Sequence, residues 1–219
     1  MALGLGRLES ADGRDMFFPM KAVLPETLPP KRYKYWNPSG WWGDQGSFPH
    51  CVGYSWAHFI EDGPFMHSAT GAEVDPVKIY NEAQGLDEWE GNNYDGTSVR
   101  AGAKVLNSMG YIGAYTWAFD LETMINAVLT TSPVVVGTLW YKSMFFPDNK
   151  GVIKIGGNVG GGHAYLINGV HRDKAMFRIK NSWGRDWGKQ GYAWISFEDM
   201  ERLIREDGEI CLATEIKKI

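Results

Sequence analysis

The sequence has little cysteine: only Cys51 and Cys211 occur in 219 residues. Small secreted domains that depend on disulfides carry many more, so that class is excluded. The two thiols need not be paired, and we expect a reducing compartment, with Cys211 as a buried apolar residue in a late strand. A chain of this length can bury enough surface to fold without disulfides or metals.

Long hydrophobic runs and a large excess of one charge are also missing. No stretch approaches the roughly 18 uninterrupted apolar residues of a membrane span, and Arg7 and Glu9 interrupt the N-terminus before a signal peptide could form. We therefore expect no membrane anchor, no export signal and a cytoplasmic monomer. The net charge is −4, which disfavours nucleic acid and anionic membranes as partners.

Motifs for metals and nucleotides are absent as well. No paired cysteine or histidine spacing resembles that of a zinc site. The glycine-rich stretch 156–162 lacks the Gly-Lys-Ser/Thr ending of a phosphate loop, so we expect a mobile loop next to His163 instead. The sequence predicts no metal and no cofactor.

What the sequence does have is a clear change of pattern along the chain. Residues 1–40 hold five of the ten prolines and no regular period, which predicts an extended arm. Caps and apolar spacing predict helices over about 51–60, 75–85, 98–110 and 120–129. Beta-branched runs and glycine turns predict strands over about 133–141, 152–155, 163–171, 176–182, 191–196 and 210–216, with a charged helix over about 197–206.

Helices that come first and strands that come second predict an α+β fold. We expect one domain over 41–219, made of a helical lobe over about 41–130 and a β lobe over about 131–219. The arm over 1–40 is rich in aromatic rings, which bury much apolar area. We therefore expect the arm to pack across both lobes rather than to cover a cleft.

Cys51 is a candidate nucleophile. It begins a predicted helix, whose unpaired N–H groups and dipole favour a thiolate and can donate to an oxyanion. Gln45 lies six residues earlier, and its side-chain amide can donate a second hydrogen bond to the same oxyanion. The alternative is that Cys51 is a small buried apolar residue, which is the commoner fate of a cysteine.

A nucleophilic cysteine needs a base, and the sequence offers five histidines. His163 follows three glycines and opens a predicted strand, so a ligand can approach it closely. The other four histidines have simpler explanations. His50 lies in a turn, His58 at a distant helix position, His67 in a solvent-exposed loop and His171 at a polar strand end. Taken by itself, His163 can equally be an ordinary residue at a strand end.

Asn181 lies 18 residues after His163, at the end of the next predicted strand. Two adjacent antiparallel strands would bring the two side chains together. The asparagine oxygen can then accept the imidazole N–H and fix its orientation, and the neighbouring Trp183 can exclude water from that bond. The alternative is that Asn181 is a turn residue.

These segments resemble the active-site segments of the papain-like cysteine peptidases, which read Gln-Gly-x4-Cys, Gly-His-Ala and Asn-Ser-Trp-Gly in that order. Here they read Gln45-Gly46 before Cys51, then Gly162-His163-Ala164, then Asn181-Ser182-Trp183-Gly184. The similarity covers most of 41–196. It departs at Val52, where the family has tryptophan, and at 48–50, where the family has Cys-Gly-Ser.

The resemblance implies a papain-like two-lobed fold with an antiparallel sheet in the second lobe and the active-site cleft between the lobes. Carried over by position, Cys51 is the nucleophile, His163 the base and acid, Asn181 the orienting residue and Gln45 an oxyanion donor. A thiolate–imidazolium pair is implied at neutral pH. The residues implied to bind substrate are Gly96, Thr97, Gly162 and Trp183.

The predicted function is hydrolysis of peptide or isopeptide bonds in a peptide or protein substrate. A rival is another acyl transfer by the same thiol, such as an amidase, a transpeptidase or a cell-wall peptide hydrolase, because a triad does not dictate the acceptor. A second rival is a non-catalytic peptide-binding module. That module predicts the loss of at least one of Gln45, Cys51, His163 and Asn181, and all four are present.

Overall fold

The protein is described here from a computed structural model, which describes residues 3–27, 30–36, 40–64, 74–91 and 93–215. The five α-helices within these residues are α1 (Cys51–Asp62), α2 (Pro76–Gln84), α3 (Val99–Ser108), α4 (Leu121–Thr130) and α5 (Phe197–Arg205). Three short 3-10 helices are η1 (Gly13–Phe17), η2 (Met20–Val23) and η3 (Lys142–Phe145). The strands are β1 (Tyr33–Tyr35), β2 (Ala114–Ala118), β3 (Val134–Tyr141), β4 (Val159–His171), β5 (Met176–Lys180), β6 (Tyr192–Ser196) and β7 (Glu209–Thr214).

The helices begin where the sequence places caps. The Asp75 carboxylate accepts hydrogen bonds from the backbone N–H groups of residues 77 and 78, and Pro76 occupies the first helical position. Ser98 caps α3 and Asp120 caps α4 in the same way, each accepting one backbone N–H of the first turn. These three helix starts are therefore confirmed, because local capping chemistry decides them.

Within the described residues the seven strands form one antiparallel sheet in the order β2-β7-β3-β4-β5-β6, and β1 pairs with β4. The strand β3 lies in the middle, and its run Val134–Val136 is fully buried. The register of β3 on β4 places Thr138 opposite His163. His163 is thus fully buried beside β3, at a part of β4 that lies before the residues paired with β5.

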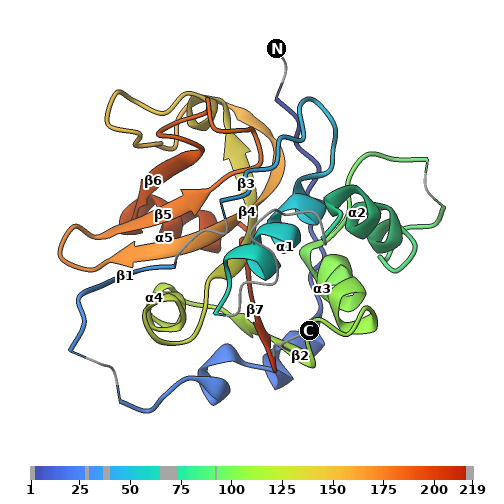
Figure 1. Ribbon diagram of the computed structural model, residues 1–219, viewed down its shortest axis with the longest axis horizontal. Helices are drawn as coiled ribbons and strands as arrows, with labels where there is room; N and C mark the ends of the chain where they lie inside the picture. The colour runs from blue at the N-terminus through green and yellow to red at the C-terminus, as the bar shows by residue number, and fades with distance from the viewer. Residues whose placement is uncertain (1–2, 28–29, 37–39, 65–73, 92, 216–219) are drawn as a thin grey trace.

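Two cores lie on opposite faces of the sheet. One face packs against α1 and α3, with α2 packed on these two helices, and the other face packs against α4 and α5, as Figure 1 shows. Alternate residues of β3 point to the two cores: Val135 joins the first, and Val134 and Val136 join the second. The α+β two-lobed fold is confirmed, although α4 packs in the core of the β lobe.

Two differences from the expected strands have physical causes. Residues 152–155 form only one isolated bridge, between Val152 and Trp194, because both backbone groups of Val152 bond to Asp148: its N–H donates to the carboxylate, and its carbonyl accepts the Asp148 N–H. The strand β2 was not expected. It forms because it pairs along its whole length with β7, a partner that is distant in the sequence.

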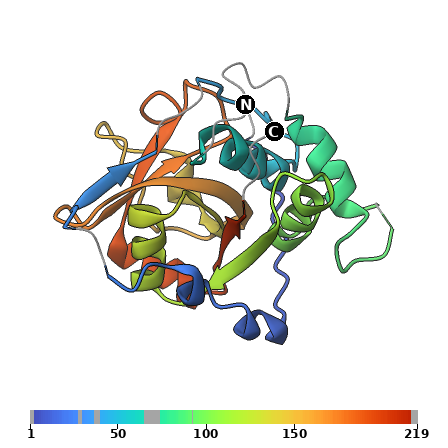
Figure 2. The same ribbon diagram turned by 60° about the horizontal axis from the view of Figure 1, so that its bottom comes forward.

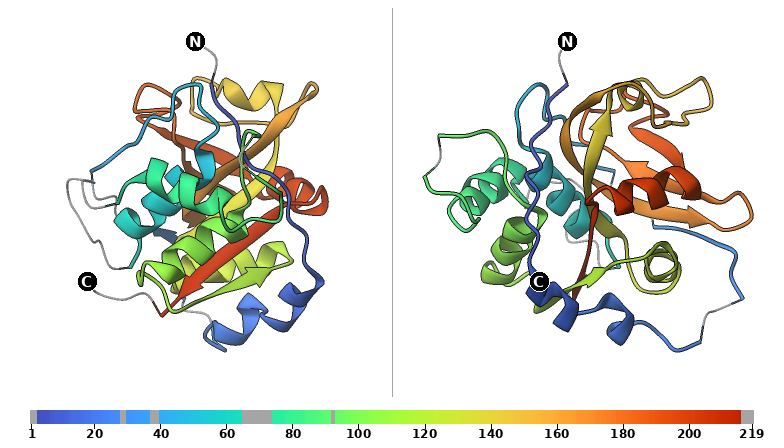
Figure 3. Two further views of the ribbon diagram at one scale, coloured as in Figure 1. Left: turned by 90° about the vertical axis from the view of Figure 1, so that its right-hand side faces the viewer. Right: turned by 180° about the vertical axis from the view of Figure 1, so that it is seen from behind.

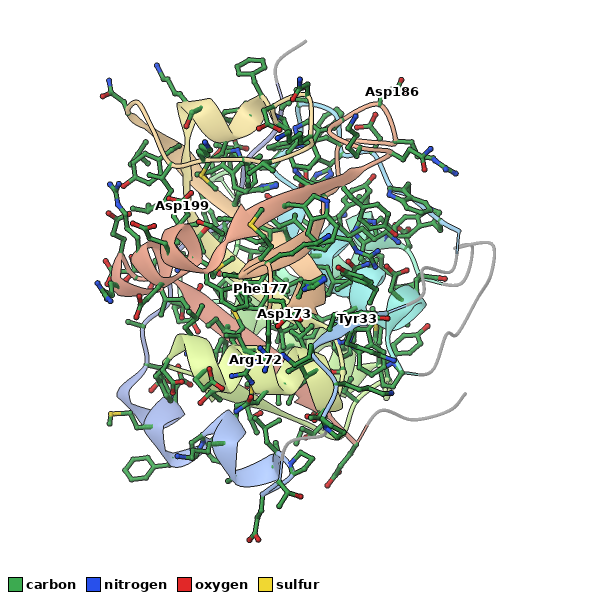
Figure 4. All side chains as sticks on the ribbon, turned by 90° about the vertical axis from the view of Figure 1, so that its left-hand side faces the viewer. Tyr33, Arg172, Asp173, Phe177, Asp186 and Asp199 are labelled. Atoms are coloured by element: carbon green, nitrogen blue, oxygen red, sulfur yellow. The ribbon has the colours of Figure 1, made fainter. Side chains whose placement is uncertain are left out.

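The arm runs along the surface of both lobes. Met20 is fully buried in the second core, and η1 and η2 lie beside β2, at the front in Figure 2. Further along, β1 pairs with the end of β4, where Tyr33 stacks on His171 at 5.4 Å. Figure 4 shows Tyr33 beside the turn that carries Asp173, whose carboxylate pairs with Arg32.

Candidate active site

Cys51 lies at the first position of α1 and faces β4. Its Sγ accepts a hydrogen bond from the backbone N–H of Ala164 at 3.4 Å, and Ala164 is the residue after His163. The side chain has no exposed surface. The helix start and the strand that carries His163 therefore meet at the sulfur.

His163 and Asn181 are in direct contact. The ring nitrogen Nε2 of His163 lies 2.8 Å from Oδ1 of Asn181, and that oxygen also accepts the backbone N–H of Ser182 at 2.8 Å. Trp183 stacks on the imidazole with 4.6 Å between ring centres. Among the described residues, the other ring nitrogen, Nδ1, is buried without a hydrogen-bond partner. The asparagine thus holds one nitrogen and leaves the other available for proton transfer.

Gln45 is linked to the same site, and its side chain has three hydrogen-bond partners. Its Oε1 accepts a hydrogen bond from the Ser182 hydroxyl at 2.5 Å. Its Nε2 donates to the carbonyl of Phe48 at 2.7 Å and to the carbonyl of Gly4 at 3.2 Å. The amide that the sequence predicts as an oxyanion donor therefore already has a carbonyl of the arm as its acceptor.

Residues 3–8 of the arm lie over this site, which differs from the packing that we expected for the arm. The N–H groups of Gly6 and Arg7 both donate to the carbonyl of Gly162, at 3.1 and 3.0 Å. On the other side, Thr97 donates to the carbonyl of Gly6 and accepts the N–H of Leu8, both at 2.9 Å. Figure 3 shows this N-terminal segment running between the helices and the sheet.

The four residues expected to bind substrate all contact residues 3–8. Gly162 and Thr97 pair with its backbone, and the indole N–H of Trp183 donates to the carbonyl of Gly4 at 3.1 Å. Gly96 leaves room for it, since a Cβ there would lie 2.6 Å from the Gly6 carbonyl oxygen. We call the space between Thr97 and Gly162 the groove. It is shaped for an extended backbone.

Burial controls the electrostatics of Cys51 and His163. Desolvation raises the pKa of the Cys51 thiol to about 12, against smaller opposing hydrogen bonds from backbone N–H groups. Desolvation also lowers the pKa of His163 to about 4, which the Asn181 hydrogen bond only partly offsets. In this closed arrangement burial therefore favours the neutral thiol and the neutral imidazole, in contrast to the thiolate–imidazolium pair that the resemblance implies.

The remaining histidines lie away from the pair. His50 is the residue before α1 and packs on Tyr80 with 4.5 Å between ring centres. His58 is fully buried inside α1, and neither ring nitrogen has a hydrogen-bond partner among the described residues. His171 ends β4 against Tyr33. His67 lies outside the described residues.

Sequence reasoning missed the part that residues 3–8 play. Gly4 and Gly6 contact the loop before the nucleophile so closely that a Cβ at either would lie 2.1 Å from a backbone oxygen of residue 48 or 49. The alternation of glycine with larger residues over 3–8 was the available signal. This alternation does not show which residues the segment contacts, because those residues are distant in the sequence.

Known proteins identify the family to which this arrangement belongs. The family described as papain family cysteine protease matches residues 66–209, a range that includes His163 and Asn181 and begins after Cys51. The chain belongs to the papain family of cysteine proteases. This membership confirms the resemblance of the motifs.

Several papain-family relatives are similar over part of their length. Cysteine proteinase 2 of Zea mays is 33% identical over 119 residues, which are 49% of this chain and 32% of that protein. Cathepsin B-like cysteine proteinase 6 of Caenorhabditis elegans is 30% identical over 81 residues, which are 36% of this chain and 21% of that protein. This chain therefore spans well under two thirds of the length of either relative.

Solved structures of the papain family share the fold. Xylellain, a cysteine protease from Xylella fastidiosa, superposes with a TM-score of 0.74 at 22% identity, covering 98% of this chain and 97% of that chain. The digestive procathepsin L2 proteinase of Tenebrio molitor superposes with a TM-score of 0.62 at 18% identity, covering 97% and 78%. At these identities the likeness shows the fold alone.

The described residues hold neither a cluster of metal-ligating side chains nor a helix that could cross a membrane. Among them, no group of three or more histidine, cysteine or acidic side chains is placed to hold a metal ion. None of their helices combines the length and the apolar content that a membrane crossing requires.

Proposed function

We propose that the protein is a cysteine peptidase that hydrolyses peptide or isopeptide bonds through Cys51, His163 and Asn181. The single observation that carries this proposal is the meeting of the Cys51 sulfur with the N–H of Ala164 while His163 bonds Asn181. Cys51 thus contacts the residue that follows His163, and His163 contacts Asn181 directly. Family membership supports the same reaction class.

The reaction needs an open groove, since Cys51 and His163 have no exposed surface beneath residues 3–8. When those residues leave, water and substrate reach both side chains. Rehydration relieves the desolvation that holds the thiol and the imidazole neutral, so proton transfer from sulfur to Nδ1 becomes favourable. Asn181 keeps Nε2 occupied and so directs the proton to Nδ1.

The chemical steps then follow from the residues present. The Cys51 thiolate attacks the scissile carbonyl carbon, and the carbonyl oxygen becomes an oxyanion that accepts from Gln45 Nε2 and the backbone N–H of Cys51. His163 returns its proton to the leaving amine, the C–N bond breaks, and a thioester remains on Cys51. Water attacks the thioester while His163 takes its proton, and the acid product leaves with the thiol restored.

The test uses the full chain and the Cys51→Ala variant, with Cys211→Ala as the matched control because Cys211 is equally buried but lies in β7. In the Gly6→Ala background, which opens the groove, a peptidyl epoxide that alkylates thiols should label the chain with both cysteines and the Cys211→Ala variant, and fail to label Cys51→Ala. Peptide hydrolysis, followed by mass spectrometry of the products, should be lost only in Cys51→Ala. Hydrolysis that persists in Cys51→Ala would reject the proposal.

A further inference from the structure

Trp140 packs against the imidazole of His163, although the two residues belong to different strands. The register of β3 on β4 places Trp140 opposite Gly161, two positions before His163, so the two side chains are diagonal neighbours. Their ring centres are 4.8 Å apart, and the ring planes meet at 69°. Neither side chain has any exposed surface. A buried residue outside the proposed triad therefore packs on the proposed base.

Trp140 lies beside a stack of three rings that includes the imidazole. Trp183 lies on His163 with 4.6 Å between ring centres and 16° between planes, and Phe145 lies on Trp183 with 5.4 Å and 14°. The Trp140 ring is nearly perpendicular to both, at 84° to Trp183 and 83° to Phe145, with centres 5.5 and 6.4 Å away. A stacked ring restrains its partner out of the plane, whereas a perpendicular ring beside it restrains the partner within the plane. The two tryptophans thus restrain the imidazole in different directions.

Trp140 is itself held by a packed core. It belongs to the second core, where its ring centre lies 5.5 Å from that of Tyr165 and 6.4 Å from that of Trp187. The Tyr165 hydroxyl lies 3.2 Å from the Thr138 hydroxyl, which ties β4 to β3 at this point. Packed interiors deform little, so the position of the indole limits the space that the imidazole can occupy.

The indole N–H of Trp140 carries a cost that a phenylalanine would avoid. Among the residues that the structure describes, its Nε1 is buried and has no hydrogen-bond partner. An unpaired buried donor destabilises a fold, and native proteins hold few of them. Stability alone would therefore favour phenylalanine here. Departures of this kind are expected at functional sites, and the larger ring of tryptophan is the one that packs on the imidazole.

The orientation of the imidazole matters for the proposed reaction because one nitrogen is already in use. Asn181 bonds Nε2 at 2.8 Å, and within the described part of the chain Nδ1 has no partner. The bond to Asn181 holds one atom, so the ring can still pivot about it. Pivoting would carry Nδ1 away from Cys51, whose sulfur is bonded to the next residue of β4. Proton transfer needs the two atoms within hydrogen-bond reach.

We propose that Trp140 is a positioning residue, which holds the imidazole of His163 so that Nδ1 can exchange a proton with the Cys51 sulfur. The inference rests on the proposed function, because it takes His163 as the proton carrier. Trp140 acts through His163, since its own side chain is wholly buried. Its effect therefore shows in the pairing of sulfur and imidazole, which an alkylation rate reports without any substrate.

The experiment measures how the rate of Cys51 alkylation by iodoacetamide depends on pH, in the whole chain carrying Gly6→Ala. An imidazolium beside the sulfur favours the thiolate, and an opposite charge this close lowers a pKa by about 1–3 units. His163→Gln removes the imidazole and should move the midpoint of the profile upward by about that amount. Trp140→Met replaces the rigid ring with a flexible chain and should move the midpoint upward by at least about 1 unit. Trp140→Phe keeps a ring and should move it less.

The charged and titratable neighbours of His163 stay in place in all the Trp140 variants. They are Cys51 of α1, Tyr165 of β4 at 6.0 Å between ring centres, and Arg7 of the arm with its partner Glu209. A shift in the profile of a Trp140 variant therefore reports a change in the geometry of the imidazole and not the loss of a charge.

Phe177→Leu is the matched control. Phe177 is equally buried in the second core, but it lies in β5 and packs on Phe197 with 4.7 Å between ring centres. This variant should lose stability as the Trp140 variants do and keep the midpoint of its Gly6→Ala parent. Circular dichroism checks that each variant folds, and Trp140→Leu takes the place of Trp140→Met if the latter does not fold.

Peptide hydrolysis gives a second readout. In Trp140→Met, kcat should fall about 10- to 100-fold while KM stays within about threefold, because positioning acts after the substrate has bound. A midpoint that moves in His163→Gln but not in Trp140→Met would overturn the inference, and so would an equal shift in Phe177→Leu. An unmoved midpoint in His163→Gln would reject the proposed function and the inference with it. Midpoints that move as expected in a chain that cleaves no peptide would reject the proposed hydrolysis alone.

Discussion

Lys180 and Asp62 form an ion pair with 2.8 Å between Nζ and Oδ1, and both side chains are wholly buried. Asp62 ends α1, the helix that begins with Cys51, and Lys180 ends β5, immediately before Asn181. The ammonium also lies 4.6 Å from the ring centre of Trp42. The pair therefore fixes the helix that begins with Cys51 against the strand that precedes Asn181.

Replacing Lys180 with methionine should destabilise the protein by about 3–5 kcal/mol, because it leaves the Asp62 carboxylate buried without its cation. Urea unfolding followed by circular dichroism measures the change. The control is Lys78→Met, which breaks an exposed pair with Glu82 and should cost under about 1 kcal/mol. Similar losses in the two variants would contradict a dominant role for burial.

Replacing Gly6 with alanine should open the groove. The added Cβ would lie 2.1 Å from the Pro49 carbonyl oxygen, and overpacking of this kind costs about 1–3 kcal/mol. The rate at which iodoacetamide alkylates Cys51, measured by peptide mass spectrometry, should rise about 5- to 150-fold. The control is Gly13→Ala, where a Cβ has no atom within 4 Å, and its rate should match the wild type.

Replacing Gln45 with alanine should lower kcat by about 100- to 1,000-fold and leave KM nearly unchanged, because its hydrogen bond strengthens only as the oxyanion forms. Steady-state kinetics in the Gly6→Ala background measure both constants. Ser47→Ala is the control, an exposed residue in the same loop. An unchanged kcat in Gln45→Ala would remove Gln45 from the oxyanion site.

The free energy of unfolding should fall as the pH falls from about 6.5 toward 4. Burial lowers the pKa of His163 from 6.5 to about 4, so between these values the unfolded chain binds a proton that the folded chain does not. The His163 contribution is fully present above pH 6.5 and should lose about 3 kcal/mol by pH 4.

Because burial also lowers the pKa of His58 well below its usual range, the wild type alone cannot isolate His163. The His163→Gln variant lacks this titrating group. Urea midpoints at several pH values should show a smaller acid loss in His163→Gln than in the wild type. Parallel curves for the two proteins would contradict a depressed pKa at His163.

The parts of the fold that could be predicted are those with local causes. Helix starts at Asp75, Ser98 and Asp120 depend on side chains within three residues of the bonds they accept. The expected contact of His163 with Asn181 needs only two adjacent antiparallel strands, and β4 pairs with β5 in this way. Short sequence motifs were therefore enough to predict most residues of the candidate site.

The parts that could not be predicted depend on distant contacts. Arg7 meets Glu209 across 202 positions of the chain, and β2 exists because β7 pairs with it. The directions of the pKa shifts of Cys51 and His163 likewise depend on what covers them. Helix position and a neighbouring imidazole favour a thiolate, but the desolvation of the buried sulfur outweighs the hydrogen bonds that its neighbours donate.

The anchoring of the arm determines how residues 3–8 compete with a substrate for the groove. The chain is fastened 7 to 12 residues after Leu8 by the ion pair of Asp15 with Arg100, the bridge of Pro19 to Trp117 and the burial of Met20 in the second core. A detached N-terminal segment therefore stays at an effective concentration of about millimolar, however dilute the protein is. Dilution should therefore not activate the proposed peptidase. Cutting the chain between Leu8 and Asp15 should activate it, because residues 3–8 then become a separate peptide that can diffuse out of the groove.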